Sequence, residues 1–142
     1  MTTAFPGYPI NARGWTMLEL VIALIILAIL VALAIPAYNN QIIKARRADG
    51  HALLFEAAQR EQQFFTANNT YTSTIGSGGL DMSATSQEGY YTLSVATTAT
   101  TYTLTATRVS PQTADTYCGN LTLTHQGVKG VTNATWTADR CW

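Results

Sequence analysis

An unbroken apolar run between Trp15 and Ile35 limits the folds that are open to this chain. The run holds 21 residues, and Thr16 and Glu19 are its only polar members. A helix rises about 1.5 Å per residue, so a helix of this length covers about 30 Å, the thickness of the hydrocarbon core of a bilayer. An apolar stretch this long, rich in Leu, Ile and Ala, predicts a membrane helix rather than a buried strand.

The acidic residue near the start of this run has two interpretations. Thr16 and Glu19 have the S/T-x-x-E spacing of a capping box, which satisfies free backbone N–H groups at a helix start. A carboxylate there also suits the positive end of the helix dipole. The alternative is a functional role, because a carboxylate within a bilayer costs about 2.5–3.5 kcal/mol on insertion scales. The run alone leaves both interpretations open.

The segment Gly14-Trp15-Thr16-Met17-Leu18-Glu19-Leu20 resembles the prepilin motif of the type IV pilins. In that family a dedicated peptidase cuts after the glycine and methylates the new N-terminal amine. An acid stands at the fifth residue after the cut. The resemblance therefore implies processing at Gly14 and Trp15. It also implies that Glu19 takes part in assembly. Trp15 departs from the family, where this residue is usually Phe and sometimes Met.

The resemblance extends to Pro36 and Tyr38, where many pilins have a helix-kinking proline and a nearby tyrosine. It places assembly determinants at Thr16, Glu19 and Pro36. It implies a leader over residues 1–14, a transmembrane and assembly helix over 15–37, and a periplasmic head over 38–142. The longer leader departs from most of the family.

The charges that flank the run disagree with this orientation. Arg13 precedes the run, while three basic residues follow it closely: Lys44, Arg46 and Arg47. A positive-inside count would therefore place the N-terminus outside. The resemblance implies the opposite: a leader in the cytoplasm and a single-pass inner-membrane protein that later joins an extracellular pilus. We follow the motif and attribute the basic residues to a helix that continues beyond the membrane.

A second, amphipathic half of the helix is expected over residues 38–66. Pro36 lacks a backbone donor and predicts a kink there. Two apolar stripes follow at three- and four-residue spacing. The first is Ala45, Ala48, Ala52 and Phe55, and the second is Leu54, Ala58 and Phe65. Either the head covers one stripe and neighbouring subunits cover the other, or both belong to one broad core face.

The rest of the chain predicts a small antiparallel sheet. Residues 67–89 are rich in Ser, Thr, Gly and Asn and predict a long loop. Alternating segments at 90–96, 101–107 and 120–124 predict strands with one buried face. A turn at 125–130 and a short fourth strand follow. The predicted fold class is α+β: a long N-terminal helix packed on a sheet of three to four strands spanning 90–130, which the resemblance makes a type IV pilin fold.

Cys118 and Cys141 are the only cysteines. Beyond a membrane segment and without metal-ligand clusters, they most simply form one disulfide, and two unpaired buried thiols are the alternative. A cysteine-bounded C-terminal loop over 118–141 is also a pilin feature. Its compact form is similar to that of PilE-type minor pilins.

The chain lacks patterns for chemistry. The net charge is zero, the acids of the head are scattered, and His51 and His125 have no neighbouring Cys or carboxylate at ligand spacing. No nucleotide-binding or hydrolase motif occurs. We therefore expect no enzyme activity, no cofactor and no metal. Only Arg108, Lys129 and Arg140 are basic beyond residue 89, which argues against nucleic acid as a partner.

The sequence thus predicts a structural subunit, a minor pilin of a type IV pilus. Its partners would be other pilin subunits in a helical fibre, the prepilin peptidase, the inner-membrane assembly machinery and the membrane itself. The resemblance associates it with fimbriae, twitching motility and cell adhesion. The alternatives are a pseudopilin of a type II secretion system, or a pilin that displays an adhesive or DNA-uptake surface.

Overall fold

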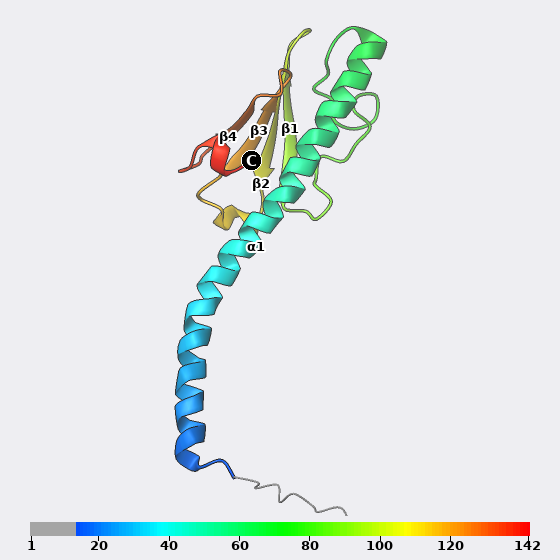
Figure 1. The fold of residues 1–142 in the computed structure, drawn as a ribbon. Coiled ribbons are helices and arrows are strands. Elements are labelled where there is room, and N and C mark those ends of the chain that lie inside the picture. The colour runs from blue at the N-terminus through cyan, green and yellow to red at the C-terminus, as the bar shows by residue number, and fades with distance from the viewer. Residues whose placement is uncertain (1–13) are drawn as a thin grey trace, which may run out of the picture. The chain divides into compact units, whose positions relative to one another are not determined.

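The computed structural model describes residues 14–142, apart from the side chains of residues 36 and 37. One helix, α1 (Met17–Asn68), is followed by a four-stranded sheet and two short 3-10 helices (Figure 1). The strands are β1 (Tyr91–Thr97), β2 (Tyr102–Arg108), β3 (Asn120–Thr124) and β4 (Lys129–Thr132). The 3-10 helices are η1 (Gln112–Ala114) and η2 (Ala138–Arg140). The chain divides into two compact units, Met1–Tyr38 and Asn39–Trp142.

The described part of the first unit is the apolar half of α1. Every residue from Gly14 to Ile35 is exposed, and this part of the helix is long and apolar enough to cross a membrane. Soluble proteins rarely expose an apolar surface of this size to water, so this surface indicates contact with lipid or with other protein chains. The leader predicted at residues 1–14 lies outside the described residues except for Gly14. The backbone stays helical through Pro36, and the kink expected there stays a prediction.

The second unit, which we term the head, holds the sheet and the rest of α1. The strands lie in the order β1-β2-β3-β4, and each neighbouring pair is antiparallel. The predicted α+β class, with one helix packed on an antiparallel sheet, is confirmed. The fourth strand begins at Lys129, so Lys129 and Gly130 belong to a strand rather than to the predicted turn. Gly130 pairs with Thr122 and extends the ladder.

The core of the head lies between α1 and one face of the sheet. Its centre is formed by Leu54 of α1 with residues of the first three strands, among them Tyr91, Leu104 and Leu121. A Cβ at Gly50 would stand 3.0 Å from both the Leu121 side chain and the Tyr91 ring. Glycine therefore lets the helix approach the sheet closely, which explains a residue that otherwise weakens a helix.

The two predicted stripes of α1 have different surroundings. Leu54 is buried and Ala58 and Phe65 are partly buried, so the second stripe faces the core. The first stripe is exposed at all four positions. A single broad core face is therefore wrong. The buried face of the helix also includes two charged residues, Arg47 and Glu61, that neither stripe contained.

The long connection between α1 and β1 is fastened to the helix. The carboxylate of Asp49 accepts hydrogen bonds from the backbone N–H groups of Glu88 and Tyr90, and Arg60 donates to the carbonyls of Leu80 and Asp81. These contacts satisfy backbone groups that the loop leaves without ladder partners.

Glu61 makes a further tie to this loop. One of its carboxylate oxygens accepts the N–H of Thr72 at 3.2 Å, while the other has no partner among the described residues. Burial raises the pKa of Glu61, because enclosure disfavours its charged form.

Candidate functional site

The start of α1 carries the predicted cap. The backbone N–H of Glu19 donates to Oγ1 of Thr16 at 3.2 Å, which is one half of a capping box. Trp15, Thr16 and Glu19 are all exposed, so the geometry leaves the carboxylate available to a partner as well. The cap and the assembly role are therefore compatible, and the roles proposed for Gly14, Trp15 and Glu19 stay predictions.

A buried ion pair fastens α1 to the segment between β2 and β3. Arg47 donates through Nε to Oδ2 of Asp115 at 2.6 Å and through Nη2 to Oδ1 at 2.9 Å. Arg47 is 5% exposed and Asp115 is fully buried. A bidentate contact of this kind is the strongest geometry available to an arginine and a carboxylate. The pair therefore fixes the position of the helix against this segment.

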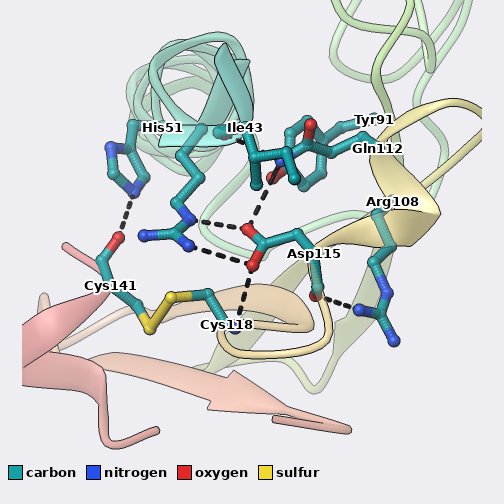
Figure 2. Close-up of polar contacts among 9 residues, drawn as sticks. Ile43, His51, Tyr91, Arg108, Gln112, Asp115, Cys118 and Cys141 are labelled. Atoms are coloured by element: carbon teal, nitrogen blue, oxygen red, sulfur yellow. Dashed lines mark hydrogen bonds and ion pairs between the residues drawn. A yellow bond between two sulfur atoms is a disulfide. The ribbon is translucent and has the colours of Figure 1, made fainter. Parts of the chain in front are cut away.

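Further hydrogen bonds surround Asp115 (Figure 2). Its Oδ1 accepts the N–H of Cys118, and Nε2 of Gln112 lies 3.3 Å from its Oδ2. Nε2 of Gln112 also lies 3.1 Å from the carbonyl oxygen of Ile43 and 3.2 Å from the hydroxyl of Tyr91. Burial raises the pKa of Tyr91 to about 12, and the Asp115 carboxylate contributes, so this hydroxyl stays protonated. The network joins α1, β1 and η1.

The disulfide lies beside this network. Cys118 and Cys141 are bonded and buried, which ties the segment before β3 to the C-terminus. The carbonyl of Cys141 accepts a hydrogen bond from Nε2 of His51 at 3.1 Å, so the C-terminal segment is also held by α1 (Figure 2). Burial lowers the pKa of His51, and the charges of Lys129 and Arg47 lower it further, so the ring is neutral near pH 7.

Aromatic rings and cationic side chains lie close together at the C-terminal segment. Trp142 stacks on His51 at 4.6 Å, and the Nζ of Lys129 lies 5.3 Å from the Trp142 ring. The Arg140 guanidinium lies 5.7 Å from the Trp136 ring. We term this surface the basic–aromatic strip and define it by six residues: Lys44, Tyr117, Lys129, Trp136, Arg140 and Trp142.

The strip combines positive charge with aromatic rings, among which Tyr117 is exposed, and such a surface suits phosphate groups and flat rings. Sequence reasoning missed it, because its members come from α1, the segment before β3, β4 and the C-terminus. Among residues 14–142, no cluster of three or more His, Cys, Asp or Glu side chains is placed to hold a metal ion.

A long helix with an exposed apolar first half, laid by its second half across an antiparallel sheet with a disulfide-closed C-terminal loop, is the architecture of a type IV pilin. A family model described as "Type IV minor pilin ComP, DNA uptake sequence receptor" matches residues 36–122, more than half of the chain. The chain therefore belongs to this family of type IV minor pilins. The predicted resemblance to minor pilins is confirmed, and family and fold are those of a structural subunit.

One solved structure is also similar. "High-Resolution Structure of a Type IV Pilin from Shewanella oneidensis" is 27% identical and has a TM-score of 0.46, with 61% of this chain and 89% of that chain covered. No curated protein matches the chain. The family match includes Lys44, Arg47, Asp115 and Cys118 but ends before β4, so most of the basic–aromatic strip lies beyond it.

Proposed function

We propose that this chain is a minor pilin that a prepilin peptidase cuts after Gly14 and that joins a type IV pilus through its N-terminal helix. The observation that carries the proposal is the apolar half of α1, which is exposed throughout, in a chain of the minor pilin family. Before assembly this helix anchors the protein in the inner membrane, with the head in the periplasm. In the pilus, neighbouring subunits take the place of lipid around it. Membership of a pilin family favours this role over that of a pseudopilin.

Glu19 has a specific part in this proposal. Cutting after Gly14 frees the amine of Trp15, and a neighbouring subunit displaced along the fibre would bring its own Trp15 amine to this Glu19. Among packed apolar helices an unpaired carboxylate is costly, whereas the paired charges offset each other. The pairing forms only in the fibre, so it selects the register of subunits and leaves the monomer unaffected.

Glu19→Gln is expected to leave membrane insertion and head folding intact while incorporation into pili falls sharply. Removing one partner of a buried ion pair costs about 3–5 kcal/mol. Glutamine still serves in a capping box, so this change removes the charge and keeps the cap. The measurement compares the amounts of the variant in the membrane and sheared-pilus fractions, and mass spectrometry checks that the mature chain begins at N-methylated Trp15.

Thr16→Ala is the matched control for Glu19→Gln. It removes the hydroxyl that accepts the Glu19 N–H and should cost about 1 kcal/mol of helix stability, with little change in assembly. Wild-type incorporation of Glu19→Gln would contradict the assembly role and leave Glu19 as a cap.

We propose as a second candidate function that the head binds DNA through the basic–aromatic strip. The observation that favours it is the set of cations over ring faces near the C-terminus, in a family described as a DNA uptake sequence receptor. The small number of basic residues beyond residue 89 by itself disfavours nucleic acid as a partner. In the fold, however, Lys129 lies over the Trp142 ring and Arg140 over the Trp136 ring, and Trp136 lines one pocket together with Lys44 of α1. A surface of this kind suits a pilin that captures DNA outside the cell.

Replacing Lys129 and Arg140 together with alanine is expected to weaken DNA binding and to reduce the slope of log K against log salt by about two. Each phosphate contact contributes about 0.9 to that slope. The measurement is a fluorescence anisotropy titration of the mature chain in mild detergent with a duplex of mixed sequence at several salt concentrations. Arg46→Ala is the control, since Arg46 lies over Tyr90, outside the strip. An equal loss with Arg46→Ala would show a general charge effect and contradict a site at the strip.

A further inference from the structure

A pocket of about 240 Å³ opens in the head between α1 and the C-terminal loop. Its lining comes from three parts of the fold: Asn40, Ile43, Lys44 and Arg47 of α1, Ala114 and Tyr117 after β2, and Trp136 of the C-terminal loop. Pockets for drug-sized ligands measure about 300–1,000 Å³, so this one suits a smaller group. The pocket is continuous with the basic–aromatic strip, because Lys44, Tyr117 and Trp136 belong to both.

Two cations reach this pocket. Arg47 uses Nε and Nη2 to hold Asp115, and no hydrogen bond joins its Nη1 to any residue of the described part of the chain. The ion pair thus fixes the guanidinium in place and leaves one nitrogen for another acceptor. The Lys44 side chain is exposed beside it and forms no ion pair within residues 14–142. An anionic group would therefore meet a fixed donor and a mobile one.

The remaining wall is aromatic and apolar. Tyr117 and Trp136 stack at a centroid distance of 4.5 Å with an angle of 29° between their planes, and Tyr117 is 48% exposed. Ile43 and Ala114 supply apolar surface, and Asn40 supplies an amide that both donates and accepts. A flat ring with polar edges fits such a wall, because stacking on aromatic faces tolerates any base.

We propose that this pocket takes one unstacked nucleotide of a DNA strand, with its base against Tyr117 and Trp136 and its phosphate on Lys44 and Arg47. The inference rests on the proposed DNA-binding function and adds to it that one of the bound nucleotides is unstacked and unpaired. A carboxylate side chain of a neighbouring pilin would use the two cations and leave the aromatic wall without a role. The nucleotide uses both parts of the pocket.

A preference for unpaired DNA follows from this geometry. A base inside a duplex must leave its stack and its partner before it can enter the pocket, which costs a few kcal/mol. A single strand, a frayed end or a mismatch avoids most of that cost. The strip itself contacts phosphates and binds both forms, so the pocket adds affinity for the single strand alone.

The test compares an oligo-dT single strand with a hairpin duplex that carries the same number of phosphates, each titrated into the full mature chain in mild detergent. The wild-type chain is expected to bind the single strand more tightly. Ala114→Leu narrows the pocket without changing a charge, and Trp136→Ala removes part of its wall. Each should weaken single-strand binding about tenfold, in line with the usual effect of losing one stacked base. Ala114 lies outside the strip, so Ala114→Leu should change duplex binding less than about twofold.

The outcomes distinguish a failure of the pocket proposal from a failure of the DNA-binding proposal. Suppose that the Lys129→Ala and Arg140→Ala changes abolish duplex binding while Ala114→Leu leaves single-strand binding unchanged. This result would contradict the proposal that the pocket binds a nucleotide and would support the DNA-binding function of the strip. Absence of binding to either probe would overturn both. If Ala114→Leu binds both probes normally but is lost from pili, the pocket contacts a neighbouring subunit instead. That result would contradict the proposal that it binds a nucleotide.

Discussion

Asp115→Ala is expected to lower the free energy of unfolding of the head by about 3–5 kcal/mol, the usual effect of removing one partner of a buried ion pair. Arg47 would stay buried with its charge uncompensated. The same change removes the acceptor of the Cys118 N–H and one contact of Gln112. Thermal unfolding of the mature chain in mild detergent, followed by near-ultraviolet circular dichroism, should show a midpoint lower by at least about 12 °C.

Two further variants separate the ion pair from a general effect of charge. Asp139→Ala removes an exposed acid and should change the stability by less than about 0.5 kcal/mol. The double variant Arg47→Met with Asp115→Leu removes both charges and should recover much of the loss, because apolar replacements of a whole buried pair are often tolerated. If Asp115→Ala melts at the wild-type temperature, the pair does not fasten the helix.

The ion pair shows where sequence reasoning stopped. Asp115 lies 68 residues from Arg47 along the chain, and the acids of the head had no pattern that would select one of them. Spacing along the helix did hold a signal. Arg47, Gly50, Leu54, Ala57 and Glu61 recur at three- and four-residue intervals, and all five are buried. Tracing apolar residues alone left out the two charged members of this face, so the need for a buried partner was missed.

Local patterns served better for the helix and the strands. The alternation of Tyr, Leu, Val and Thr predicted β1, β2 and β3 to within one or two residues, because one face of each strand is buried. β4 is only four residues long, too short to show an alternation, and Gly130 within it resembles a turn residue. Periodicity in the sequence therefore located the longer elements, whereas β4 is defined by its pairing with β3 in the folded head.

The candidate site was harder to predict because its parts are distant in the chain. Lys44 was assigned to a helix leaving the membrane, and Trp136 and Trp142 had no assigned role. Folding of the disulfide-closed loop against α1 places Trp136 beside Lys44 in one pocket and stacks Trp142 on His51. No spacing rule relates residues of a helix to those of a loop some 90 positions away, so the number of basic residues alone could not show which of them the fold places near one another.

Replacing Cys118 and Cys141 together with serine is expected to lower the free energy of unfolding by about 2–5 kcal/mol, the range for a disulfide of a small exported domain. The bond closes a loop between residues 23 positions apart, and its loss lets the unfolded chain explore more conformations. The folded state is affected too. Without the bond, the C-terminal segment is held by the His51 hydrogen bond, the Trp142 contacts and backbone hydrogen bonds.

Reductant distinguishes the effect of the bond from that of the serines. Wild-type protein unfolded without reductant should resist thiol labelling and should lose thermal stability when reductant is added. The serine variant should unfold at the same temperature with or without reductant. Because η2 and Trp142 lie beyond the main sheet, the variant should also lose single-strand DNA binding before it loses the helix–sheet core. Labelling of both cysteines in envelope-derived protein would contradict the bond and, with it, the periplasmic position proposed for the head.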